Sequence, residues 1–184
     1  MKVLLDLNVV LDVILNRLPW IADSLQVWNA QQSGQFDGYL AATELTNLSY
    51  IVGRTAEKAT AKNAVGICLN SFRIVPVDHA VLVAANAMAG NDFEDNVCSA
   101  CADVVAADWI VTRDKSGFEH SNVPAISPSD LLLKIAAGEN ELAATLNFYL
   151  AVGLHCTKTR WPVKRMYSVH PARPRFTLGE RWRK

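Results

Sequence analysis

Short apolar runs alternate with longer amphipathic stretches along most of the chain. The segments between the runs carry apolar residues every three or four positions, which predicts helices. Five runs have the length and the Val, Leu and Ile content of buried strands: Val3–Asn8, Gly38–Leu40, Arg73–Val77, Trp109–Thr112 and Val123–Ile126. The predicted order is β-α-α-β-α-α-β-α-α-β-β-α. Strands that alternate with helices in this way indicate an α/β fold with a parallel sheet and helices on both faces.

Proline, glycine and acidic residues predict where several elements begin or end. Pro19 is expected in the first turn of the second helix. Gly53 is expected to end the helix that begins near Glu44. Pro76 predicts that its strand lies at an edge of the sheet or ends early. Asp78 is expected to cap the helix that follows.

Four carboxylates occupy one kind of position in this pattern. Asp6 and Asp114 follow predicted strands, whereas Glu44 and Asp95 open predicted helices. In a doubly wound sheet such positions lie at the carboxyl ends of the strands, where ligands bind. Converging carboxylates repel each other unless a cation neutralises them. Hard divalent cations such as Mg²⁺ or Mn²⁺ take oxygen ligands of this type.

Several of these acids also have an ordinary structural interpretation. Asp6 is in place to cap the first helix, and the helix dipole favours Glu44 in a first turn by ~0.3–1 kcal/mol. Three acids, Asp92, Glu94 and Asp95, surround one helix start, which is more than capping requires. We expect Asp92 to be the cap, and either Asp92 or Glu94 remains able to exchange roles with Asp95. Both the capping and the metal-binding interpretations stay open at this point.

Composition places the chain among globular proteins. Of its 184 residues, 51% are hydrophobic and 20% are charged, which is not a disordered composition. No apolar run approaches the ~20 residues of a membrane span, and the first residues lack the apolar stretch of a secretory signal. The four cysteines do not suggest a disulfide framework. We therefore expect a cytoplasmic protein without membrane contact.

Charge divides the chain into two parts. Residues 1–137 hold 15 acidic and 9 basic side chains, a balance of −6, and residues 138–184 hold 3 and 9, a balance of +6. The acidic part argues against a broad electrostatic surface for nucleic acid. We expect a folded domain over residues 1–136 and a basic C-terminal extension, partly disordered or ordered by a partner, over 137–184. The extension interleaves basic and aromatic residues, so binding of single-stranded nucleic acid stays open as its alternative role.

Five segments, in this order along the chain, resemble the PIN-domain ribonucleases. They are Leu4–Asp12, Ala42–Leu45, Asp92–Asp95, Ile110–Phe118 and Val123–Pro128. The resemblance covers about residues 1–135. It implies a three-layer α/β/α fold with a central parallel sheet, a site for Mg²⁺ or Mn²⁺, and endonucleolytic cleavage of RNA. Many bacterial members resemble VapC-type toxins, so the resemblance also implies a small antitoxin partner and a homodimer.

The resemblance assigns roles to residues of this chain motif by motif. The residues that match the family's acidic catalytic positions are Asp6, Glu44, Asp95 and Asp114. Three of these, Asp6, Asp95 and Asp114, are the expected metal ligands. The secondary candidates are Asn8, Asp92 and Thr112. Apart from the resemblance, Arg113 and Lys115 flank Asp114, and two interpretations of them stay open: contacts with RNA phosphate and ordinary exposed charge.

Two positions depart from the family's pattern. Relatives often carry Thr at the position of Leu7 and an acid at the position of Gly117. Gly117 therefore leaves open a non-catalytic RNA-binding or assembly module that keeps the PIN fold. A metal-dependent phosphohydrolase is a third possibility, although the sequence has no Gly-rich phosphate loop.

Three further residues receive structural interpretations. Asp12 lies four positions after Asn8, and we expect it to be a solvated helix residue. Cys98 and Cys101 form a C-x-x-C pattern inside a predicted helix with no second pair. We expect both thiols to pack in the core.

Overall fold

The computed structural model describes residues 1–56 and 58–138. Its strands form one all-parallel sheet in the order β3-β2-β1-β4-β5. The strands are β1 (Lys2–Leu5), β2 (Asp37–Ala41), β3 (Arg73–Val75), β4 (Trp109–Val111) and β5 (Ala125–Ile126). The predicted central parallel sheet is confirmed.

Helices fill the intervals between the strands, as the periodicity predicts. They are α1 (Leu7–Ile14), α2 (Ile21–Gln32), α3 (Ala42–Thr55), α4 (Lys58–Ser71), α5 (His79–Ala87) and α6 (Phe93–Val105). A short 3₁₀ helix, η1 (Lys115–Phe118), follows β4, and residues 128–138 are helical after β5. The order of elements agrees with the prediction apart from η1.

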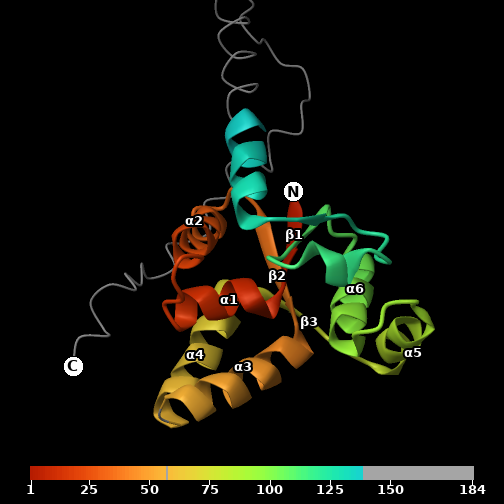
Figure 1. Cartoon of the computed structure of the whole chain (residues 1–184), viewed down its shortest axis with the longest axis horizontal. Helices are drawn as coiled ribbons and strands as arrows, with labels where there is room; N and C mark the ends of the chain where they lie inside the picture. Colours follow the sequence, from red (N-terminus) through yellow and green to blue (C-terminus); the bar gives the residue numbers. More distant parts are fainter. Residues whose placement is uncertain (57, 139–184) are drawn as a thin grey trace, which may run out of the picture. The chain divides into compact units, whose positions relative to one another are not determined.

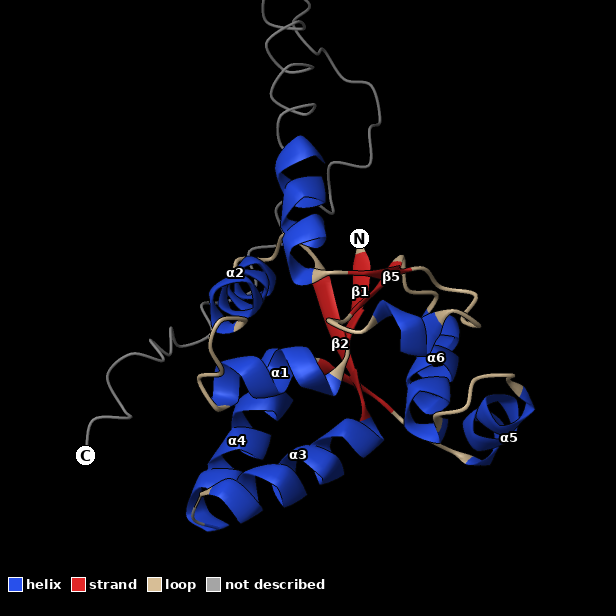
Figure 2. Cartoon of the chain, viewed as in Figure 1, coloured by secondary structure: helices blue, strands red, loops and turns tan. Residues whose placement is uncertain are grey.

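The sheet lies between two groups of helices. Helices α1 to α4 lie on one side and α5 and α6 on the other (Figure 1), with the strands between them (Figure 2). The strand order first runs from β1 through β2 to β3 and then returns to β4 on the other side of β1. Because parallel crossovers are right-handed, this reversal places the later helices on the opposite face. The predicted three-layer α/β/α fold is confirmed.

The central strand β1 is the most enclosed part of the sheet. Val3, Leu4 and Leu5 have no exposed surface, as expected for a strand that has neighbours on both sides and helices on both faces. Strand β1 pairs with β2 on one side and with β4 on the other. The strand order reverses between β1 and β4, and ligands of open α/β sheets bind at such a switch point.

Two predicted helix boundaries are wrong. Pro19 lies in the turn before α2, whose N-cap is Trp20, and not in the first helical turn. Gly53 lies inside α3, which continues to Thr55. A Cβ at Gly53 would come within 3.7 Å of the Ala61 Cβ on α4. Gly53 therefore faces α4 at a distance that leaves room for a side-chain methyl group, and it does not end the helix.

Other local predictions are confirmed. Asp78 caps α5 and accepts a hydrogen bond from the Val81 N–H at 3.0 Å. Strand β3 lies at the edge of the sheet and ends directly before Pro76. Strand β1 is shorter than predicted because it ends at Leu5, where Asp6 begins the cap of α1.

The predicted basic extension, residues 137–184, lies outside the described residues except for residues 137 and 138, which are helical. Its predicted disorder and its alternative role in nucleic-acid binding both stay predictions. Among the described residues, no helix combines the length and the apolar character that crossing a membrane requires.

Candidate active site

Asp6 and Thr112 are neighbours because β1 and β4 end at the same level of the sheet. Leu5 pairs with Val111, and the Asp6 N–H donates to the Val111 carbonyl oxygen at 3.0 Å. The next residue of each strand therefore turns a polar side chain toward the other. The Thr112 hydroxyl donates to Asp6 Oδ2 at 2.6 Å. This bond joins the two strands at the switch point.

Asn8 completes this hydrogen-bond network. Its Nδ2 group donates to the Asp6 carboxylate and to Thr112 Oγ1, the latter at 3.0 Å. Its Oδ1 accepts from the Arg113 N–H at 3.3 Å. The Asn8 N–H also donates to Asp6 Oδ1 at 3.5 Å, which makes Asp6 the N-cap of α1. The capping interpretation of Asp6 is confirmed, and burial raises the pKa of the same carboxyl.

Glu44 lies in the first turn of α3, just after β2, and is almost fully buried. Only 2% of its surface is exposed, and its Oε2 has no hydrogen-bond partner. Burial, followed by repulsion from neighbouring acids, raises the pKa of Glu44 to about 9. These neighbours are Asp6, Glu94 and Asp95. An unpaired buried carboxylate is costly, so Glu44 keeps its proton at neutral pH when no cation is bound.

Asp95 lies in the first turn of α6 and is half-buried. Asp92 caps this helix, as predicted, and its Oδ1 accepts from the N–H groups of Glu94 and Asp95. Burial, followed by the charges of other acids, raises the pKa of Asp95 to about 6. These acids are Asp6, Asp92, Asp114 and Glu94.

Asp114 has a different environment from the other three acids. Its N–H donates to Thr112 Oγ1 at 2.9 Å, which places it at the end of β4 beside Asp6. Its exposed carboxylate caps η1 and accepts from both the hydroxyl and the N–H of Ser116. These hydrogen bonds hold the pKa of Asp114 below its ordinary value. Asp114 is therefore ionised over the whole neutral range.

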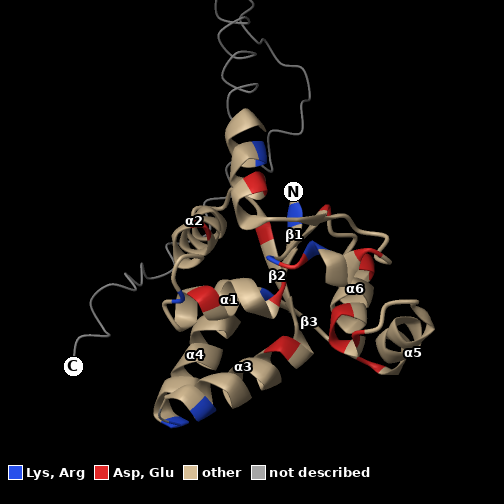
Figure 3. Cartoon of the chain, viewed as in Figure 1, with Lys and Arg blue, Asp and Glu red and all other residues tan. Residues whose placement is uncertain are grey.

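The four predicted acids lie near one another in the fold, because the charges of Asp6 and Asp95 act on Glu44 and the charges of Asp6 and Asp114 act on Asp95. Figure 3 shows acidic positions at the starts of α3 and α6, on the sides that face each other. In residues 1–56 and 58–138, no group of three or more His, Cys, Asp or Glu side chains is already arranged to hold a metal ion. The donor set nevertheless fits a hard divalent cation, because it offers carboxylate oxygens. The buried, unpartnered oxygen of Glu44 supports the same conclusion.

The sequence prediction for Asp12 is wrong. Asp12 has no exposed surface, and its Oδ2 lies 3.3 Å from Arg113 Nε and accepts from the Ser24 hydroxyl at 3.1 Å. The signal was present in the sequence, because nearly all of α1 is apolar and no face of it is left for water. The prediction for Cys98 and Cys101 is confirmed, since both thiols are free and buried.

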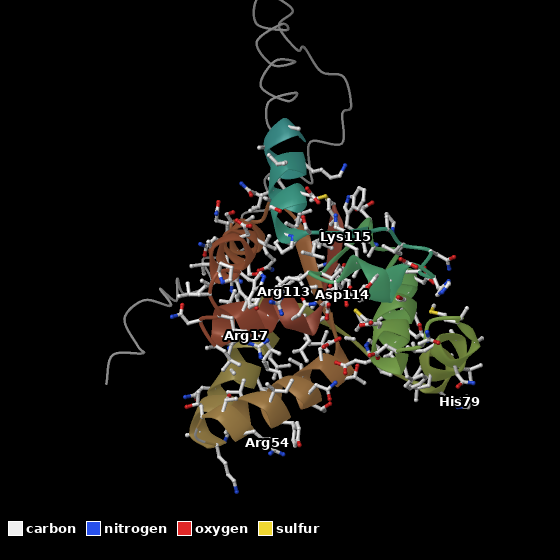
Figure 4. All side chains as sticks on the ribbon, viewed as in Figure 1. Arg17, Arg54, His79, Arg113, Asp114 and Lys115 are labelled. Atoms are coloured by element: carbon white, nitrogen blue, oxygen red, sulfur yellow. The ribbon has the colours of Figure 1, made fainter. Side chains whose placement is uncertain are left out.

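The two candidate RNA contacts are both paired with acids of the chain. Besides contacting Asp12, the Arg113 guanidinium lies 4.2 Å from the centre of the Trp20 ring. Lys115 pairs with Asp130 at 2.9 Å, and this pair is exposed. Figure 4 shows Arg113, Asp114 and Lys115 close together between α1 and α6. Arg113 and Lys115 are the sequence neighbours of Asp114, but neither has a free charge, because each is paired with another acid.

A family model described as PIN domain matches residues 2–116. This match covers more than half of the chain, and the chain belongs to the PIN domain family. Its membership confirms the resemblance that the five sequence segments indicated. A search of curated protein sequences finds no match.

Solved structures with the same fold include three from different organisms. One is VapBC2 from Rickettsia felis, whose structure contains a DNA fragment from the promoter of VapBC2. It has 14% identity and a TM-score of 0.52, and the match covers 69% of this chain and 98% of that chain. FitAcB from Neisseria gonorrhoeae has 22% identity, a TM-score of 0.52 and coverage of 68% and 97%. PAE2754 from Pyrobaculum aerophilum has 15% identity, a TM-score of 0.52 and coverage of 74% and 90%. At these identities the similarity shows the fold.

Proposed function

We propose that this protein is a divalent-metal-dependent endoribonuclease that hydrolyses RNA phosphodiester bonds. The observation that carries the proposal is the acidic cluster at the switch point, with Glu44 buried and one of its oxygens unpartnered. Membership of the PIN domain family supports the same activity.

Each acid contributes differently to the proposed site. Asp6, Asp95 and Asp114 would hold Mg²⁺ or Mn²⁺. Asp6 is fixed by Thr112 and Asn8, and Asp114 stays ionised through its bonds to Ser116. When bound, the cation supplies charge stabilisation for the phosphoryl group and lowers the pKa of a bound water.

The raised pKa of Glu44 makes cation binding at the proposed site depend on release of a proton. With a pKa of about 9, its carboxyl is protonated at neutral pH in the cation-free protein. A nearby positive charge favours the ionised form, so occupation of the site favours release of the Glu44 proton. At neutral pH, Glu44 thereby becomes a carboxylate when a cation occupies the site.

The test is cleavage of single-stranded RNA by the purified chain with Mn²⁺, and its arrest by a chelator. We expect Asp6→Asn and Asp95→Asn each to reduce the rate about 100-fold or more, as loss of metal-supporting groups does. Asp103→Asn is the matched control, because Asp103 is an exposed acid on the same helix as Asp95. Full Mn²⁺-dependent activity in Asp6→Asn would show that the assignment is wrong.

The same assay separates the proposal from its alternatives. A protein that binds RNA without cleaving it, with or without Mn²⁺, is the non-catalytic module. Cleavage of a small phosphate ester without cleavage of RNA indicates a phosphohydrolase. A single-stranded DNA of the same sequence tests whether the substrate is RNA.

We also propose that the chain is the toxin of a toxin–antitoxin pair, that it binds a small antitoxin protein, and that it forms a homodimer in the cytoplasm. The likeness of its fold to VapBC2 and FitAcB supports this role. Expression of the wild-type chain alone is expected to arrest growth, and expression of Asp6→Asn is not. Light scattering on the purified protein measures the oligomeric state.

A further inference from the structure

Gly117, the position at which relatives often carry an acid, lies directly against the carboxylate of Asp95. A Cβ atom at Gly117 would come within 2.1 Å of Asp95 Oδ2 and within 2.9 Å of its Cγ. Both distances are too short for real atoms. We propose that Gly117 is a positioning residue: the missing side chain is what lets the Asp95 carboxylate reach the place where the acids converge. The inference rests on the proposed function and names a determinant of the same site.

The elements on either side fix this contact. Helix α6 packs against η1, and η1 is held in place by the Asp114 cap and by the buried side chain of Phe118. Gly117 lies in the middle of η1, so its backbone cannot retreat from α6 without disturbing the cap. The free partner in the contact is the end of the Asp95 side chain, which turns about its χ1 torsion.

Because the Asp95 side chain can turn, a larger residue at position 117 is expected to change the position of the Asp95 carboxylate more than the stability of the fold. In Gly117→Ala, the carboxylate of Asp95 moves by about 1 Å to restore a van der Waals separation, and the backbone stays in place. The folded state therefore loses little stability, whereas the arrangement of the acids changes. A change of this size at a preorganised site weakens cation binding.

Gly90, just before α6, also lies against a side chain, but that side chain is not free to turn. A Cβ at Gly90 would come within 2.2 Å of Asn96 Oδ1, nearly the same overlap as at Gly117. Asn96, however, is only 5% exposed, and its Nδ2 donates to the Gly90 carbonyl oxygen at 2.9 Å. Asn96 cannot turn away without leaving buried polar groups unpaired. Gly90→Ala is therefore expected to lower the melting temperature, which Gly117→Ala is not.

The first test is Mn²⁺ binding by calorimetry, without RNA, on the full chain and on Gly117→Ala. We expect binding about tenfold weaker or more in the variant, with an unchanged melting temperature. Gly66→Ala is the control, because a Cβ at Gly66 of α4 has no neighbour within 4 Å. If the wild type binds Mn²⁺ and Gly117→Ala binds it with equal affinity, the inference is overturned, and a large loss of melting temperature in Gly117→Ala overturns it too.

A second measurement does not depend on the cation. A crystal structure of Gly117→Ala is expected to show the Asp95 carboxylate displaced by about 1 Å while the backbone of η1 is unchanged. An undisplaced carboxylate overturns the positioning role. If the wild type binds no Mn²⁺ but the displacement is found, the proposed function fails and the positioning role of Gly117 stands.

Discussion

At the scale of single residues, one hydroxyl connects most of the candidate site. The Thr112 side chain is fully buried. It donates to Asp6 Oδ2 and accepts from Asn8 Nδ2 and from the Asp114 N–H. The ends of β1 and β4 and two capping residues, Asp6 and Asp114, therefore depend on a single oxygen. A buried group that loses its partner costs about 1–3 kcal/mol.

Thr112→Val keeps the shape of the side chain and removes this oxygen. We expect the free energy of unfolding to fall by about 2 kcal/mol, because the Asp114 N–H and an Asn8 N–H lose their acceptor. Urea denaturation measures the loss. Thr112→Ser retains the hydroxyl and is the control. If Thr112→Val and Thr112→Ser are equally stable, the hydrogen bonds of Thr112 do not hold the site together.

Glu44 predicts a stability that depends on pH in the absence of a cation. Its pKa is raised from 4.5 to about 9 in the folded protein. The folded state thus keeps a proton that the unfolded chain releases above about pH 4.5. The contribution of Glu44 to stability is greatest below this pH and declines as the pH rises toward 9.

Glu44→Gln removes this titration. In the presence of a chelator at pH 7, we expect the variant to be more stable than the wild type by roughly 2–3 kcal/mol. Its unfolding free energy should also vary less than that of the wild type between pH 5 and 8. Glu119→Gln, at an exposed acid, is the control. A variant less stable than the wild type at pH 7 contradicts the assignment of Glu44 as a buried, protonated acid.

At the scale of elements, the predictions that succeeded depend on neighbours in sequence. The caps at Asp6, Asp78 and Asp92 were predictable because a cap bonds to N–H groups two or three residues away. The parallel sheet was predictable because apolar runs alternated with helical periodicity.

The predictions that failed depend on contacts between distant segments. Gly53 faces Ala61 on another helix, and the charge of Asp12 is balanced by Arg113, which lies about a hundred positions further along the chain. The contact of Gly117 with Asp95 is of the same kind. Sequence order predicted which acids form the candidate site, whereas the residues that contact them became visible only through the packing of α1, α6 and η1.

The Arg113–Asp12 pair ties the segment after β4 to α1, and Arg113→Ala tests this connection. The change leaves a carboxylate with no exposed surface and removes the stronger of the two positive charges that act on it, Arg113 and Arg17. Such a loss costs about 3–5 kcal/mol in a fully buried pair, and we expect a loss near 3 kcal/mol because Ser24 still donates to Asp12. Chemical denaturation measures it.

Lys115→Ala is the matched control for this experiment. Lys115 lies two positions away and also pairs with an acid, Asp130, but both side chains are about half exposed. Exposed pairs contribute about 0–1 kcal/mol. Asp12→Asn in the Arg113→Ala background is expected to recover part of the lost stability, since it removes the unpaired charge. Equal losses in Arg113→Ala and Lys115→Ala would contradict a structural role for the buried pair.

At the scale of the whole molecule, residues 1–137 have an acidic balance of −6, and the acids that act on Glu44 and Asp95 lie where the sheet changes direction. Without a cation, rising pH adds negative charge at Glu44 and Asp95, and their mutual repulsion opposes folding. A bound divalent cation counteracts this effect, because it competes with protons for the same oxygens. The stability of the folded chain is therefore expected to fall less steeply with rising pH when the cation is bound than when it is absent.

This weaker dependence on pH is the final prediction. At pH 7.5, Mn²⁺ at about 100 times its dissociation constant at that pH is expected to add about 2.7 kcal/mol to the free energy of unfolding. A chelator is expected to remove the gain, and the same Mn²⁺ concentration is used at pH 5.5. The gain should be smaller at pH 5.5 than at pH 7.5, because Asp95, with a pKa of about 6, holds its proton at the lower pH. Thermal unfolding at both pH values measures it, with K⁺ at equal ionic strength as the control for screening. An equal gain in the Asp6→Asn, Asp95→Asn double variant would place the cation elsewhere on the molecule.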